Sequence, residues 1–237
     1  MNTAIPVVNI RSLVGKTDIK PTVILIGAAL IPAVHKAFGS MESWARMFGP
    51  SPGISPPLFM FGTACILMGV IPYVLIRTVF KESREEYGLR LGDWKFGALS
   101  VVILAPVIGL ALLYPASQTG EIRAYYPFTH EAERSWSLFM ILQGSRVVFF
   151  YTAWEFFYRG FLLFGLRHQF GAWPAICIQV VPQCLWHIGM PTGELMSSIA
   201  GGLLFGIMAL RTGSILWPML LHSFIGVCLD LFIVLSH

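Results

Sequence analysis

The chain has 237 residues, of which 56% are hydrophobic and only 12% are charged, and its mean hydropathy is +0.71. Soluble domains carry about 25% charged residues, so this composition excludes a disordered chain, a disulfide-rich secreted module and an ordinary soluble enzyme. The low charge and the high hydropathy instead predict an integral membrane protein. The net charge of +4 comes without a basic run interleaved with aromatic residues, so we expect no nucleic-acid partner.

The apolar stretches predict an all-α polytopic bundle of about seven transmembrane helices. At roughly 20 residues per crossing plus short loops, the length suits six to eight spans. In chain order, the candidate spans are residues 21–34, 58–76, 96–117, 136–166, 172–188, 195–210 and 214–235. We expect no cleavable signal peptide, because the first stretch lacks a small-residue exit and further spans follow it.

Lysine and arginine residues between the spans predict the orientation. With the N-terminus inside, the inner segments carry ten of these residues and the outer segments carry four. The inner ten are Arg11, Lys16, Lys20, Arg77, Lys81, Arg84, Arg90, Lys95, Arg167 and Arg211, and the outer four are Lys36, Arg46, Arg123 and Arg134. Basic residues concentrate on the cytoplasmic side of membrane proteins, so we expect a cytoplasmic N-terminus.

Small residues within the spans indicate packing rather than chemistry. Four cysteines lie in apolar stretches without a C-x-x-C pair, so we expect free, buried, hydrophobic side chains. These are Cys65, Cys177, Cys184 and Cys228. In the sixth span, Ser198, Gly202 and Gly206 recur every four residues, a spacing that lets helices approach closely.

A few ionisable residues lie inside the predicted spans. A charged group near the bilayer centre costs about 2.5–3.5 kcal/mol on insertion scales, so such groups usually face a bundle interior and mark a functional site. The charged residues are Arg146, Glu155, Arg159 and Asp230, and two histidines, His187 and His222, join them.

The individual positions allow two kinds of interpretation. Glu155 and Arg159 are four residues apart on one helix face, which suits either a structural ion pair or a functional site. Arg146 alone is typical of a structural or snorkelling arginine. His222 and Asp230, eight residues apart, predict a buried pair or a proton relay. Glu194, in a Pro-x-x-Glu segment that begins at Pro191, is explained as a helix-start carboxylate.

Depth along the helices tests whether these groups meet. At 1.5 Å per residue, Glu155 lies about 16 Å and His222 about 12 Å from the inner ends of their spans. His187 lies about 22 Å from its inner end, which places it too far out unless the helix is tilted or begins later. A glutamate and two histidines at one depth suit hydrolysis by an activated water.

The order and spacing of these residues resemble the CPBP, or ABI, family of intramembrane endopeptidases, which includes the type II CAAX prenyl endopeptidases. The resemblance covers roughly residues 136–230. The first motif, Glu-Glu-x-x-x-Arg, corresponds to Trp154-Glu155 through Arg159. The second, Phe-x-x-x-His, corresponds to Gln183 through His187, and the third, His-x-x-x-Asn/Asp, corresponds to His222 through Gly226.

This chain departs from the family pattern at Trp154, Gln183 and Gly226. The resemblance implies that Glu155 activates water, that His187 shares this water, that His222 binds the oxyanion and that Arg159 holds Glu155, with Glu194 and Asp230 in support. A bacterial branch with a Trp-Glu first motif and a Pro-x-x-Glu segment is similar, which implies the plasma membrane of a bacterium. The resemblance also implies a division into N-terminal helices and loops (1–135) and a catalytic helical core (136–237).

Three functions remain open from the sequence. The first is an intramembrane endopeptidase that cleaves a membrane-associated peptide or protein. The second is a non-catalytic membrane scaffold or bacteriocin-immunity-type protein, which the departures at Trp154 and Gly226 allow. The third is a small transporter. Zinc is an alternative to a cofactor-free site, but no His-Glu-x-x-His helix is present, so we expect no metal.

Overall fold

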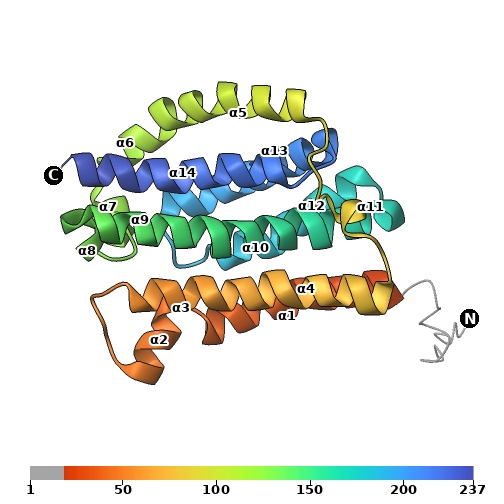
Figure 1. Ribbon diagram of the computed structural model, residues 1–237, viewed down its shortest axis with the longest axis horizontal. Coiled ribbons are helices and arrows are strands. Elements are labelled where there is room, and N and C mark those ends of the chain that lie inside the picture. Colours follow the sequence, from red (N-terminus) through yellow and green to blue (C-terminus); the bar gives the residue numbers. More distant parts are fainter. Residues whose placement is uncertain (1–18, 237) are drawn as a thin grey trace, which may run out of the picture.

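The computed structural model describes residues 19–236, and this part of the chain contains helices and no strand. Long helical rods run antiparallel along the long axis of the molecule (Figure 1). The prediction of an all-α bundle is confirmed.

Several rods are continuous helices in which π-helical turns interrupt the α-helix. The first rod is α1 (Ile19–Phe38). The second joins α3 (Ser55–Ala64), η3 (Cys65–Val70), α4 (Ile71–Val74) and η4 (Leu75–Phe80), and the third joins α5 (Trp94–Ile108), η6 (Gly109–Leu113) and α6 (Tyr114–Ser117). The fourth joins α9 (Trp136–Ser145), η7 (Arg146–Tyr151), α10 (Thr152–Glu155), η8 (Phe156–Phe164) and α11 (Gly165–Phe170). The last three are α12 (Ala172–Trp186), α13 (Thr192–Thr212) and α14 (Leu216–Leu235), and the connections hold α2 (Met41–Phe48), η5 (Arg84–Tyr87), α7 (Gly120–Tyr125) and α8 (Glu131–Arg134).

Six of the seven rods are long and apolar enough to cross a membrane. The exception is α12, which has 15 residues and is therefore about 22 Å long, against a hydrocarbon core of about 30 Å. The predicted span 172–188 is too long because a turn begins at His187, and Gly189 adopts a φ of 91°.

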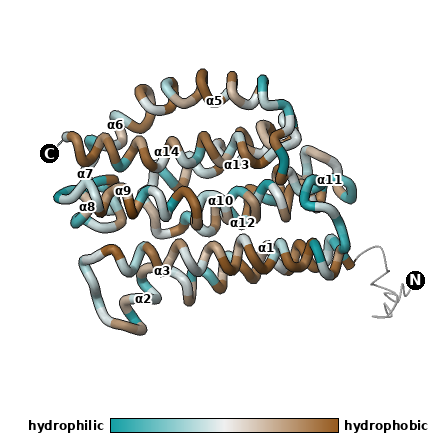
Figure 2. Tube along the Cα trace, viewed as in Figure 1, coloured by the Kyte–Doolittle hydropathy of each residue, from teal (hydrophilic) through white to brown (hydrophobic). Residues whose placement is uncertain are grey.

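The fourth rod forms the centre of the bundle. Its side chains are mostly buried, and η8 packs against α1, α12 and α13. The rods α1 and α3–η4 cover one side, and α13 and α14 cover the other (Figure 1). The α5–α6 rod lies outermost, next to α14, and is largely hydrophobic (Figure 2). Most of its apolar side chains are exposed. An apolar outer surface and a partly polar centre are what a membrane-embedded bundle requires.

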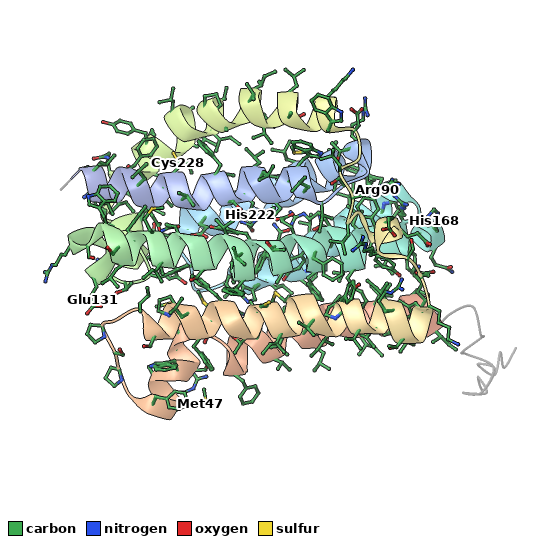
Figure 3. All side chains as sticks on the ribbon, viewed as in Figure 1. Met47, Arg90, Glu131, His168, His222 and Cys228 are labelled. Atoms are coloured by element: carbon green, nitrogen blue, oxygen red, sulfur yellow. The ribbon has the colours of Figure 1, made fainter. Side chains whose placement is uncertain are left out.

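Charged residues gather at the ends of the rods. Lys20 Nζ lies 2.6 Å from a Glu82 carboxylate oxygen, and Arg211 pairs with Asp93 at 2.9 Å. Figure 3 shows Arg90 and His168 at this end and Glu131 at the other, with His222 between them. Arg11 and Lys16 lie outside the described residues, and the assignment of this end to the cytoplasm stays a prediction, as does the division of the chain at residue 135.

The small residues of α13 do allow close packing. A Cβ atom on Gly202 or Gly206 would lie 2.9 or 3.2 Å from side chains of α12. Gln183, one of the departures from the family pattern, donates from its amide to the Ser198 carbonyl oxygen at 3.0 Å. A glutamine at this position therefore ties the end of α12 to α13.

The cysteine prediction is half right. All four cysteines are free, but none is buried: Cys177 is exposed and the others are partly exposed. Their helices turn these small side chains outward, where lipid rather than protein surrounds a membrane bundle.

Candidate active site

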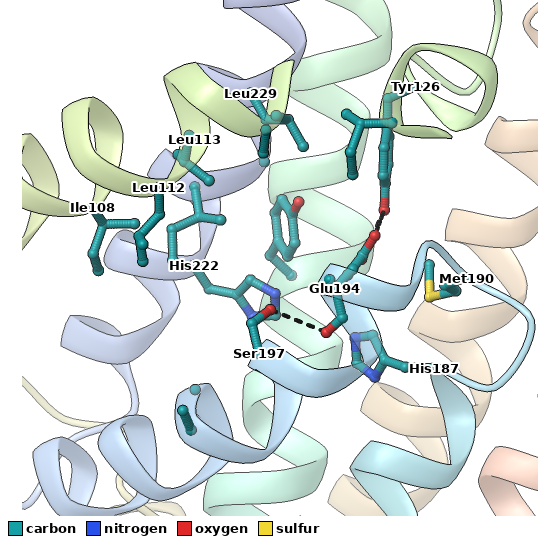
Figure 4. Close-up of a pocket in the computed structure, with 18 of the residues that line it drawn as sticks. Ile108, Leu112, Leu113, Tyr126, His187, Met190, Glu194, Ser197, His222 and Leu229 are labelled. Atoms are coloured by element: carbon teal, nitrogen blue, oxygen red, sulfur yellow. Dashed lines mark hydrogen bonds between the residues drawn. The ribbon is translucent and has the colours of Figure 1, made fainter. Parts of the chain in front are cut away.

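A cavity of about 740 Å³ lies between the outermost α5–α6 rod and the central fourth rod. Its walls are mostly apolar and come from α5, η6, η7, α13 and α14, together with the end of α12. Figure 4 shows His187, His222 and Glu194 around it, with Leu112 and Leu113 on the opposite wall. A deep apolar pocket with a few convergent polar groups is the usual form of a ligand site.

Glu155 and His222 form a direct contact between α10 and α14. His222 donates from Nδ1 to Glu155 Oε1 at 2.7 Å. An ionised carboxylate only accepts hydrogen bonds, so His222 carries its hydrogen on Nδ1, and a neutral ring then has its lone pair on Nε2. His222 lines the cavity, so a ligand in the cavity can reach the imidazole ring that carries this lone pair.

Arg159 holds the same carboxylate from the other side. Its NH1 lies 3.2 Å from Glu155 Oε1, and both side chains have no exposed surface. The Nε and NH2 atoms of Arg159 have no partner within the described part of the chain. The i,i+4 spacing places the two residues on one helix face, and Glu155 is therefore the only anion that balances this buried cation in an ion pair among the described residues.

His187 reaches the same cavity from the end of α12. It donates from Nδ1 to the Gln183 carbonyl oxygen at 2.8 Å, which leaves its Nε2 as an acceptor. The indole of Trp154 lies beside both histidines, with ring centroids 5.6 Å from His187 and 6.3 Å from His222. Trp154 lines the cavity as well and contacts both imidazoles.

The depth mismatch predicted for His187 does not occur. The fourth rod ends at Phe170 rather than at residue 166, so Glu155 lies 15 residues before its end. His187 lies 15 residues after Ala172, where α12 begins. Both residues are therefore about 22 Å from the same end of the bundle.

Glu155 itself does not line the cavity, although both histidines do. Its Oε1 atom accepts from His222 and Arg159, and its Oε2 atom is buried without a partner among the described residues. A water molecule in the cavity therefore meets the two imidazoles before it meets this carboxylate.

The predicted pairing of His222 with Asp230 is wrong. Asp230 instead accepts from Gln143 at 2.6 Å and from Arg146 at 3.1 Å. Eight residues advance a helix by 80° more than two full turns, which turns His222 toward Glu155 and Asp230 toward η7 and α9. Arg146 is accordingly a buried, paired arginine rather than one that snorkels to the interface.

Glu194 lies in the first turn of α13, as predicted, and also lines the cavity. Both of its carboxylate oxygens lie within 2.9 Å of the Tyr126 hydroxyl, which donates to them (Figure 4). Burial, together with the charge of Glu194, raises the pKa of Tyr126 well above its usual value, so the hydroxyl keeps its proton. Within the described residues, Glu194 bonds to Tyr126 and makes no hydrogen bond to Glu155 or His222.

Tyr151 was missed in the sequence, although it precedes Glu155 by four residues and shares its helix face. Its ring centroid lies 4.5 Å from that of His222. A Cβ atom at Gly226 would lie 1.7 Å from the Tyr151 hydroxyl oxygen. The series Tyr151, Glu155 and Arg159 was the signal that could have identified this residue.

The absence of a metal from the site stays a prediction. The described residues contain no group of three or more histidine, cysteine, aspartate or glutamate side chains placed to hold a metal. Nδ1 of each histidine donates elsewhere, so Nε2 is the one nitrogen on each ring that could bind a metal. The Glu155 oxygen nearest to His222 is shared with the cationic Arg159. Hydrolysis at this site without a metal ion is a proposal that a chelator can test.

Comparison with known protein families gives a match for the C-terminal part of the chain. Residues 134–228 match the family model described as type II CAAX prenyl endopeptidase Rce1-like. This range contains Glu155, Arg159, His187 and His222. No curated protein and no solved structure matches the chain.

Proposed function

We propose that the chain is an intramembrane endopeptidase, because residues 134–228 match the model of the type II CAAX prenyl endopeptidase Rce1-like family. Its substrate is a peptide bond of a membrane-associated protein, bound in the cavity of the bundle. The observation that carries this proposal is the buried Glu155–His222 hydrogen bond, which presents the second imidazole nitrogen of His222 to that cavity.

In this proposal Glu155 acts through His222 rather than on water directly. The carboxylate accepts the Nδ1 hydrogen, fixes the ring and stabilises the imidazolium that forms when Nε2 takes a proton. Arg159 positions the carboxylate. This modifies the expectation from the sequence, in which Glu155 was the direct base and His222 the oxyanion partner, because Glu155 does not line the cavity.

The reaction is then a hydrolysis by water. Nε2 of His222 removes one proton from water as the water oxygen attacks the carbonyl carbon of the peptide bond. One electron pair of the C=O bond then moves to the carbonyl oxygen. Nε2 of His187 accepts a hydrogen bond from the same water and orients it. The tetrahedral intermediate collapses, the C–N bond breaks, and the imidazolium of His222 returns its proton to the leaving amine.

A cleavage screen tests this proposal. The purified protein in lipid nanodiscs is incubated with a peptide library, and new termini are identified by mass spectrometry. We expect cleavage by the wild type and loss of about 10²-fold or more in His222→Gln and His187→Gln. His35→Gln is the matched control, because His35 is fully buried on α1 and does not line the cavity.

Two outcomes would contradict the proposed function or its metal-free mechanism. A folded wild type that cleaves no peptide in the library would refute the proposal and favour a non-catalytic scaffold. Cleavage that is lost with a chelator and restored by zinc would overturn the metal-free mechanism, and insensitivity to the chelator would support it.

A further inference from the structure

The proposed hydrolysis creates a negative charge on the former carbonyl oxygen, and that oxygen needs a hydrogen-bond donor. Neither neutral imidazole supplies one. His222 uses its only N–H toward Glu155, and His187 uses its only N–H toward the Gln183 carbonyl. The donor has to come from another group in the cavity wall.

Four hydroxyl groups line the cavity within the described residues, and three of them are engaged. Thr119 donates to the Ala116 carbonyl, and both Tyr126 and Ser197 donate to oxygens of Glu194. The fourth, Tyr151, has no hydrogen-bond partner in that part of the chain, although its side chain is 2% exposed. It is a neutral donor that its surroundings leave free.

The position of this hydroxyl is fixed by two helices. The Tyr151 ring packs against His222, with centroids 4.5 Å apart. Its oxygen fills the space in which a side chain at position 226 would begin, since a Cβ atom there would lie 1.7 Å away. Gly226 follows His222 by one helical turn, so the hydroxyl lies on the same face of α14 as the imidazole.

A cation lies beside the hydroxyl. The Arg146 guanidinium carbon is 5.1 Å from the Tyr151 ring centroid and would be 3.1 Å from the same Cβ atom at Gly226. Positive charge at this distance in an apolar site favours donation of the phenolic hydrogen toward a developing anion.

We infer that the Tyr151 hydroxyl is the oxyanion donor of this site and that Gly226 is required to make room for it. The inference rests on the proposed endopeptidase function. In it, Tyr151 donates a hydrogen bond to the carbonyl oxygen as water attacks, keeps its proton throughout and releases the oxygen when the C–N bond breaks. The glycine at position 226 and the tyrosine at position 151 are then a matched pair from neighbouring helices.

The test compares two deletions of a phenolic hydroxyl on the same rod. Tyr151→Phe removes the free hydroxyl that lines the cavity. Tyr158→Phe removes a hydroxyl that is fully buried, has no partner among the described residues and lies outside the cavity wall. Both variants are assayed in nanodiscs with a library peptide that the wild type cleaves, and kcat and KM are measured separately.

We expect Tyr151→Phe to lower kcat by about 10²-fold with KM nearly unchanged, as for loss of one oxyanion donor, and Tyr158→Phe to retain the wild-type kcat. Gly226→Ala should lower kcat in the same way, because its methyl group displaces the hydroxyl. Wild-type kcat in Tyr151→Phe, together with loss of cleavage in His222→Gln, would overturn this inference alone. A wild type without cleavage would instead mean that the proposed function has failed.

Discussion

Removing the charge of Glu155 while keeping its shape, as in Glu155→Gln, tests how far the fold depends on the buried ion pair. The pair is 3.2 Å long and both side chains have no exposed surface. With an effective dielectric constant of about 20, two unit charges at this distance attract by about 5 kcal/mol. Nε and NH2 of Arg159 are buried without a hydrogen-bond partner within the described residues. Apart from Glu155, the guanidinium has the Phe205 ring, whose centroid lies 5.2 Å from its central carbon.

We therefore expect Glu155→Gln to lower the free energy of unfolding by about 3–5 kcal/mol, the range for a buried pair that loses one partner. The double variant Glu155→Gln/Arg159→Met should recover most of this loss, because an apolar replacement removes the uncompensated cation. It should nevertheless stay inactive, since the proposed base depends on Glu155.

The assay is denaturant unfolding of the detergent-solubilised protein, followed by circular dichroism. Arg211→Met is the control, because it breaks an exposed pair of similar length and should leave stability nearly unchanged. If Glu155→Gln is as stable as the wild type, or if the double variant is no more stable than the single one, the reasoning about the buried cation is wrong.

Two further predictions concern packing and pH. Gly202→Ala should destabilise the protein by about 1–3 kcal/mol, because its Cβ atom would lie 2.9 Å from a Val180 methyl carbon. Gly201→Ala is the control and should not destabilise it, since a Cβ atom there meets nothing within 4 Å. Equal denaturant midpoints for the two variants would contradict the close α12–α13 packing. Partial burial alone would raise the pKa of Glu82, but the hydrogen bond and charge of Lys20 lower it below the usual 4.5. The stability difference between wild type and Glu82→Gln should therefore be constant above about pH 5 and shrink as the pH falls through the lowered pKa, and a difference that grows on acidification would refute this assignment.

The sequence was sufficient for the parts of the fold that follow from local pattern. Low charge and long apolar stretches predicted the helices, and the small residues of α13 predicted that a neighbouring helix approaches it closely. The i,i+4 spacing of Glu155 and Arg159 predicted their contact, since both lie on one helix and need no tertiary information.

Contacts between helices were harder to predict because they depend on where each helix ends and how it is rotated. Four extra residues at the end of the fourth rod, up to Phe170, bring Glu155 and His187 to one depth. An 80° offset on α14 separates His222 from Asp230. Tyr151 contacts His222 only because Gly226 leaves room, and no pattern within either helix reveals that combination.

The central claim is that His222, held by Glu155, removes the proton from the attacking water. The most direct test is the initial rate at which His222→Gln and His35→Gln, at equal folded fractions, cleave one library peptide that the wild type cleaves. The account predicts a rate about 10²–10⁴-fold lower for His222→Gln and a wild-type rate for His35→Gln. Equal rates for the two variants would contradict it.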